Sequence, residues 1–83
     1  MKKNLLKQHL SQILRDKKAE LKCSQAKMAE LCCISDREYS DLENDKALPQ
    51  FQTLVNMLIN LNLDFNKYIE TIVDMGYKAI DNY

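Results

Sequence analysis

Apolar residues recur at steps of three and four along the first quarter of the chain, which is the spacing of one face of an α-helix. This face is formed by Leu6, Leu10, Ile13, Leu14 and Leu21. The pattern predicts a first helix over about residues 4–22. The opposite face of this helix is rich in lysine and is therefore expected to face solvent.

A second, shorter helical pattern begins directly after this segment. Ser24 offers a side-chain oxygen that accepts from the free backbone amides at the start of a helix. Met28, Ala29 and Cys32 then fall on one stripe. We predict a second helix over about residues 25–32.

A third helical pattern follows after three residues and opens with a capping-box sequence. Ser35 is an N-cap candidate, and Glu38 stands three positions later, where its carboxylate can accept from the serine backbone amide. Tyr39 and Leu42 share the inward face. We predict a short third helix from Asp36 to about Asn44.

Residues 45–49 interrupt the helical pattern, because Pro49 disfavours a helical conformation at the residue before it. The pattern then resumes with an apolar stripe typical of a buried fourth helix. Its members are Phe51, Leu54, Val55, Leu58 and Ile59.

A fifth helix is predicted after a short connection. Asn62 tolerates the left-handed conformation that ends a helix, and Asp64 can cap the next one. The same type of stripe then continues up to Gly76. Its members are Phe65, Tyr68, Ile69, Ile72 and Val73.

The five predicted helices suit a single small domain. The chain has 83 residues, of which 46% are hydrophobic and 29% charged, with one glycine and one proline. No alternating strand pattern competes, so the fold class is all-α. We assign residues 1–76 to the domain and residues 77–83 to an apolar tail, in which Tyr77, Ile80 and Tyr83 recur at three-residue steps.

Composition also narrows the possible chemistry. The three cysteines, Cys23, Cys32 and Cys33, have no C-x-x-C spacing, and His9 is the one histidine, so no metal site and no cofactor are expected. We interpret the cysteines as reduced thiols, with Cys32 and Cys33 filling core positions. No catalytic pattern or phosphate-binding glycine loop occurs, and we expect a cytoplasmic protein that is no enzyme and has no membrane or secretory segment.

Two short helices joined by three residues describe a helix-turn-helix, whose second helix can enter a DNA major groove about 12 Å wide. The sequence from Ser24 to Leu63 resembles the Cro/repressor-type, lambda repressor-like helix-turn-helix family. The resemblance is carried by the following positions: Ser24-Gln25, Ala29, Ile34-Ser35, Leu42-Glu43-Asn44, Lys46, Pro49 and Thr53-Leu54. It implies a compact five-helix DNA-binding domain that reads an operator with its third helix.

The chain departs from the family pattern in its glycine positions, in the length of its first helix and in the charge of its third helix. The family often has glycine where this chain has Cys33, Asp45 and Asn62, and the resemblance implies a left-handed backbone there. A first-helix arginine of the family pairs with the glutamate found here at Glu43. About three extra residues between Arg15 and Ser24 leave open whether Arg15 is its equivalent.

Charge is distributed unevenly, although 12 basic and 12 acidic residues give a net charge of zero. Residues 23–48 carry six acidic and three basic side chains, so the reading helix is acidic. Its base-reading candidates are Asp36, Arg37, Glu38 and Asp41. Arginine offers a fork to guanine, and a carboxylate accepts from cytosine N4. For Arg37, an intrahelical pair with Asp41 is an equally good interpretation.

Other residues are candidates for contacts with the DNA backbone and with a second subunit. The backbone candidates are Ser24, Gln25, Ser35, Ser40, Asn44 and Lys46. The dimer candidates are Tyr68, Tyr77, Ile80 and Tyr83, because regulators of this type read two half-sites as symmetric dimers.

We therefore expect a sequence-specific DNA-binding transcriptional regulator, most simply a repressor, that binds double-stranded DNA as a homodimer. The acidic third helix also favours an alternative of another class. In that alternative the helix-turn-helix is a scaffold that binds a protein partner, as in an antitoxin-like module.

Overall fold

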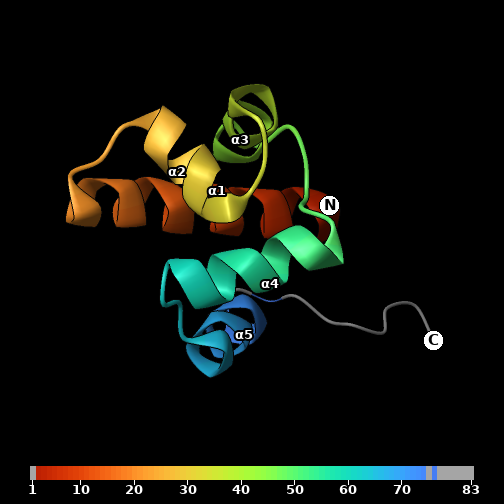
Figure 1. Ribbon diagram of the computed structural model, residues 1–83. Coiled ribbons are helices and arrows are strands. Elements are labelled where there is room, and N and C mark those ends of the chain that lie inside the picture. The colour runs from red at the N-terminus through yellow and green to blue at the C-terminus, as the bar shows by residue number, and fades with distance from the viewer. Residues whose placement is uncertain (1, 75, 77–83) are drawn as a thin grey trace.

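The computed structural model describes residues 2–74 and Gly76, and within them the chain forms five α-helices and no strands (Figure 1). The predicted all-α, five-helix architecture is confirmed. The helices are α1 Lys2–Leu21, α2 Gln25–Cys32, α3 Asp36–Glu43, α4 Phe51–Asn60 and α5 Phe65–Asp74. The predicted tail residues Tyr77, Ile80 and Tyr83 lie outside the described residues.

The cap residues anticipated from the sequence start their helices as expected. The Ser24 hydroxyl accepts from the Lys27 amide at 3.1 Å. Ser35 and Glu38 form a complete capping box, with bonds of 3.0 and 3.1 Å between each side chain and the backbone amide of the other. Asp64 accepts from the Lys67 amide at 3.1 Å at the start of α5. These local bonds satisfy amides that a helix start leaves free.

Left-handed backbone conformations occur at all three positions where the family pattern has glycine. The φ angles are 62° at Cys33, 65° at Asp45 and 56° at Asn62. Lys22 adopts a fourth, with φ of 53°, where α1 ends. Aspartate and asparagine tolerate this conformation better than other side chains, so the backbone strain is greatest at Cys33 and Lys22.

The strained backbone at Cys33 leads to a prediction about stability. Cys33 is exposed, so replacing it with glycine relieves the left-handed strain without opening a cavity. We expect Cys33→Gly to raise the free energy of unfolding by about 1 kcal/mol. Asn62→Gly is the matched control, with an expected change below about 0.5 kcal/mol, because asparagine already tolerates this conformation. Urea unfolding measures both, and equal effects of the two substitutions would contradict this interpretation.

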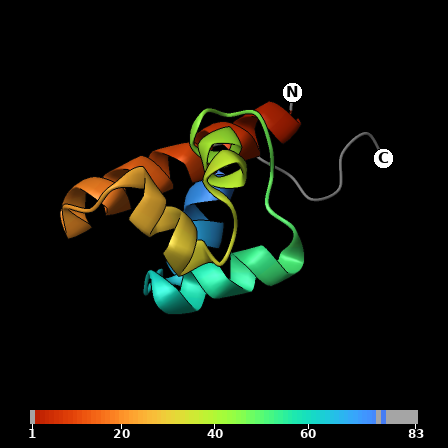
Figure 2. The ribbon, with the colours of Figure 1, turned by 45° about the horizontal axis from the view of Figure 1, so that its top comes forward.

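The core lies where α1, α2, α3 and α4 meet (Figure 2). Its largest fully buried side chain is Tyr39, which comes from the middle of α3. The other members of the buried cluster are Leu10 and Leu14 of α1, Met28, Ala29 and Cys32 of α2, Leu42 of α3, Met57 of α4, and Leu61. The inward positions predicted for α2 and α3 are therefore confirmed. The same cluster fixes α3 against the long first helix.

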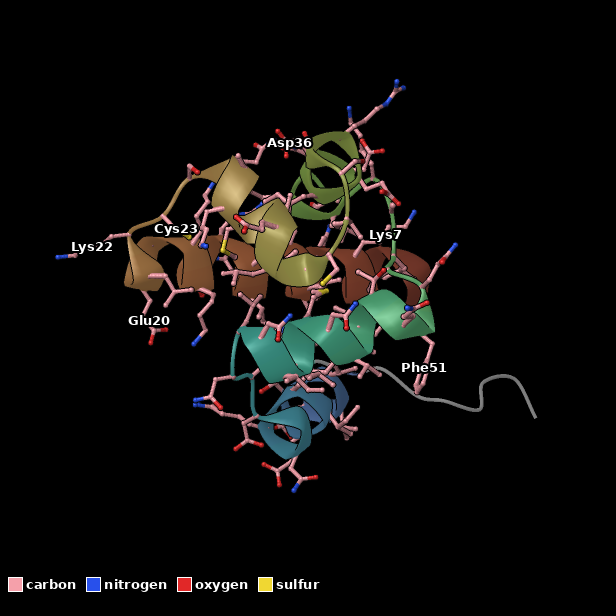
Figure 3. All side chains as sticks on the ribbon, in the orientation of Figure 1. Lys7, Glu20, Lys22, Cys23, Asp36 and Phe51 are labelled. Atoms are coloured by element: carbon pink, nitrogen blue, oxygen red, sulfur yellow. The ribbon has the colours of Figure 1, made fainter. Side chains whose placement is uncertain are left out.

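Several positions of the predicted apolar stripes do not face the core. Leu21 of α1 is 45% exposed, and Ile69 and Val73 of α5 are 42% and 58% exposed. Phe51 and Ile59 of α4 are 80% and 69% exposed, whereas Met57 of the same helix is fully buried. The apolar stripe of α4 is wider than the area that its neighbours cover, and Phe51 at the first helical position points away from the bundle (Figure 3). Cys33 is also exposed, because the chain turns away from the core where α2 ends.

Helix α5 is held beside α1 by an aromatic contact. The rings of His9 and Tyr68 stack with centroids 5.3 Å apart and planes inclined by 15°. Burial raises the pKa of Tyr68 and lowers the pKa of His9. The Nε2 atom of His9 is buried, and no described residue forms a hydrogen bond with it.

This contact predicts a pH-dependent stability. The pKa of His9 is lower in the folded chain than its usual value of 6.5, so between these two values the unfolded chain binds more protons. The stabilisation is complete above about pH 6.5 and is lost as the pH falls through the folded-state pKa of His9. We expect urea unfolding to show lower stability at pH 5.5 than at pH 7.5. His9→Phe keeps a ring without a titrating nitrogen and should lose less stability over this interval. An equal loss in both proteins would show that His9 is not the group responsible.

Candidate nucleic-acid interface

Helices α2 and α3 form a helix-turn-helix whose turn is fixed by backbone hydrogen bonds. The Cys33 amide donates to the Glu30 carbonyl and the Ile34 amide to the Ala29 carbonyl, each at 3.0 Å. These bonds satisfy carbonyls at the end of α2 and direct the chain into the Ser35 cap of α3. The angle between the two helices is then held by Met28, Ala29 and Cys32 packed with Tyr39 and Leu42.

The first turn of α3 presents its polar side chains to solvent. Asp36, Arg37 and Glu38 are exposed, and Asp41, one turn later, is half-buried. Figure 3 shows Asp36 at the upper edge of the molecule, far from α5. All four base-reading candidates therefore lie on one helix, which Tyr39 and Leu42 anchor from within.

Arg37 is free to contact a ligand. It is exposed and forms no ion pair with Asp41 or with any other residue that the structure describes. Of the two interpretations of Arg37 drawn from the sequence, the intrahelical pair is absent. An unpaired guanidinium at the start of α3 retains its full set of donors for a base or a phosphate.

One of the two carboxylate oxygens of Glu38 is used in a hydrogen bond within the fold. Its Oε1 atom accepts from the Ser35 amide, and this hydrogen bond lowers the pKa of the Glu38 carboxyl. The group is therefore charged at neutral pH, with one oxygen available to an outside donor. Glu38 can accept from a cytosine amino group, but its position is fixed by the cap.

The backbone candidates divide into residues used by the fold and residues free at the surface. Ser24 and Ser35 cap α2 and α3, and the Asn44 amide donates to the Ser40 carbonyl at 2.8 Å and to the Ser40 hydroxyl at 3.2 Å. Gln25, the first residue of α2, and Lys46, after α3, are exposed and unpaired among the described residues. These two lie on either side of α3 in sequence, Gln25 at the start of α2 and Lys46 in the turn after α3.

A buried carboxylate at the end of α3 was not predicted as a functional residue. Glu43 is only 7% exposed, and its Oε2 lies 2.7 Å from the Lys18 Nζ and accepts from the Tyr39 hydroxyl at 3.3 Å. Arg15 contacts the same residue differently, donating to the Glu43 backbone carbonyl at 2.8 Å. The ion pair with Glu43 is therefore made by Lys18, one helical turn after Arg15. The three extra residues in the first helix were the signal that could have identified it.

A second connection ties α1 to the segment after α3. Ser11 is fully buried in α1, and its hydroxyl contacts the carboxylate of Asp45 and donates to the Gln8 carbonyl at 3.0 Å. Asp45 is in the left-handed turn that ends α3. Together with Glu43, this contact fixes the carboxyl end of the reading helix against α1, which holds the exposed first turn in a defined orientation.

Comparison with known proteins identifies the family. The sequence profile of the helix-turn-helix family matches residues 13–67. The chain belongs to the Cro/C1-type helix-turn-helix family. The "ImmF control region 10 kDa protein" of Bacillus phage phi105 is 33% identical over 72 residues, which cover 82% of this chain and 80% of that protein. No solved structure matches the chain.

Family membership indicates the class of function that the helix-turn-helix serves. The protein is a DNA-binding transcription regulator. None of the described helices has the length and apolar character required to cross a membrane. The reading helix of this family member carries the acidic side chains Asp36, Glu38 and Asp41 around the single cation Arg37. That charge arrangement disfavours tight nonspecific binding to a polyanion.

Proposed function

We propose that this protein is a repressor that occupies an operator by inserting α3 into the major groove of double-stranded DNA. The observation that carries the proposal is the unpaired Arg37 on the exposed first turn of a helix anchored by Tyr39 and Glu43. Arg37 would read guanine through its O6 and N7 atoms. Asp36, Glu38 and Asp41 are the acceptors that would favour cytosine at neighbouring positions. The control-region name of the phage phi105 relative supports a role in transcription control.

Phosphate contacts on both sides of α3 would set its register on the duplex. Gln25 and the free amides at the start of α2 would contact one phosphate. Lys46 would contact another, and Asn44 beside it, whose amide nitrogen donates to Ser40, would reach the phosphate through a bridging water. Ser24, Ser35 and Ser40 support these contacts mainly by holding helix ends, since their hydroxyls already bond within the chain.

The repressor would act as a two-fold dimer through α5 and the tail. Ile69 and Val73 are exposed apolar side chains of α5, which supports an uncovered surface on that helix. Tyr77, Ile80 and Tyr83 would extend it. Tyr68 stacks on His9 of its own subunit, so its contribution would be to hold α5 in place. A variant truncated after Met75 should sediment as a monomer, and an unchanged dimer would exclude the tail from the interface.

Retention of genomic DNA fragments on the immobilised protein tests the proposed function. We expect a small set of fragments from the source genome to be retained at physiological salt and to share one short sequence. The control is the Arg37→Ala Lys46→Ala double variant, which leaves every buried residue in place and should retain no particular fragment. The same fragments on both columns, or none on the wild-type column, would overturn the proposal.

A further inference from the structure

A groove with a volume of about 170 Å³ runs between α3 and the start of α4. One part of its lining is apolar and is formed by Ile34, Ala47, Leu48 and Pro49. Leu48 is 39% exposed there, although it is a large apolar side chain. The groove therefore offers a partly uncovered apolar surface directly beside the reading helix.

The same groove carries two carboxylates. Glu38 and Asp41 stand three positions apart on α3 and both line it. Neither forms an ion pair with a described residue, and the lining contains no lysine or arginine. A groove with uncompensated negative charge repels a phosphate backbone and attracts a cation, so the ligand that complements it is a basic one.

We propose that this groove binds an arginine-bearing segment of a partner protein, and that the bound segment blocks DNA binding. The stem of an arginine would pack on Leu48 and Pro49 while its guanidinium bonds to the carboxylates of Glu38 and Asp41. Arginine fits better than lysine because its planar fork matches carboxylate geometry and its stem accepts apolar contact.

The regulatory consequence rests on the proposed function. Glu38 and Asp41 belong to the helix that would enter the major groove, so a segment seated against them occupies the space that the duplex needs. DNA and the basic segment would therefore exclude each other. When such a partner binds, the regulator would dissociate from its operator without any change in the regulator's fold.

The test uses the full chain and a fluorescein-labelled twelve-residue peptide in which arginine alternates with alanine. Fluorescence anisotropy gives its Kd for the wild type and three variants. Glu38→Gln keeps the capping box, because glutamine also serves at that position, and Asp41→Asn removes the second charge. We expect each to raise the Kd about tenfold. The matched control is Glu70→Gln, an exposed and unpaired carboxylate on α5, with an expected change below about twofold.

Two further measurements make the result specific. Amide NMR shifts on peptide addition should concentrate at Ile34, Leu48 and Thr53, and the same peptide in which lysine replaces arginine should bind more weakly. Equal effects of Glu70→Gln and Asp41→Asn, or shifts spread over the whole surface, would overturn the groove as the site. Peptide binding without any loss of DNA binding would overturn the competition. DNA binding without peptide binding would refute this inference and leave the proposed function intact, whereas peptide binding by a chain that selects no DNA sequence would refute the proposed function.

Discussion

Replacing Glu43 with alanine is expected to lower the free energy of unfolding by about 2–3 kcal/mol. The carboxylate is 7% exposed and bonds to the Lys18 ammonium and the Tyr39 hydroxyl. Its removal leaves the buried Tyr39 hydroxyl without that acceptor and leaves Lys18 without its counter-charge. Lys18 can turn partly to solvent, since 30% of its side chain is exposed, which limits the loss. Urea unfolding followed by circular dichroism measures the change.

The matched control for this substitution is Glu20→Ala. Glu20 also pairs with a lysine of α1, at 3.1 Å, but 68% of its side chain is exposed. We expect a loss below about 0.5 kcal/mol there, because water screens an exposed pair. A double-mutant cycle with Lys18→Met isolates the ion pair itself. A coupling energy near zero between Lys18 and Glu43 would contradict the role assigned to this contact.

Replacing Arg37 with alanine is expected to weaken binding to the preferred duplex by about 1–3 kcal/mol, which is roughly 5- to 150-fold in Kd. Arg37 is the one cation on the reading helix and has no partner within the described chain. The loss of sequence preference should be confined to one base pair, at which guanine is no longer favoured over the other bases. Anisotropy titrations on duplexes that differ at single positions measure both the loss and the relaxed preference.

Lys46→Ala is the control that distinguishes sequence-specific base contacts from nonspecific attraction to the phosphate backbone. Lys46 is exposed beyond the end of α3, so its removal should weaken all sequences alike and lower the salt dependence of binding by about one phosphate contact. Neither substitution touches the core, and their unfolding curves should match that of the wild type. An equal loss on every sequence after Arg37→Ala would refute base reading by this residue.

The parts of the fold that the sequence predicts are those with local causes. Helices α2 and α3 begin at the predicted residues because each cap acts on a partner three positions away, Ser24 on Lys27 and Ser35 on Glu38. The left-handed turns at Asp45 and Asn62 also have a local cause, since these side chains tolerate that conformation. The inward positions of α3 follow from helical spacing alone.

The parts that the sequence does not predict depend on contacts between distant segments. Periodicity identified the stripe of α4 but not how much of it the other helices cover, so Phe51 and Ile59 were wrongly placed in the core. The Lys18–Glu43 pair joins residues of α1 and α3 that no local pattern relates. The left-handed Lys22 was missed for another reason: local backbone bonds from Lys22 and Cys23 end α1 there, and lysine carries no signal for this conformation.

The candidate site shows the same division. Its position on α3 followed from the helix-turn-helix pattern, and Asp36, Arg37 and Glu38 are exposed as the spacing required. Whether Arg37 pairs with Asp41 was undecidable from sequence, because an exposed pair four residues apart contributes only about 0.2–0.5 kcal/mol. The acidic groove beside α3 required the positions of Leu48 and Pro49, which lie in an irregular segment.

Selection of bound duplexes from a random library, at about 50 mM and again at about 200 mM salt, tests the central claim most directly. Nonspecific phosphate binding falls steeply between these two concentrations, whereas contacts to base edges persist. We predict an enriched palindromic sequence that survives the higher salt and contains a guanine whose preference is lost in Arg37→Ala. No enrichment at either salt concentration would contradict operator reading by α3.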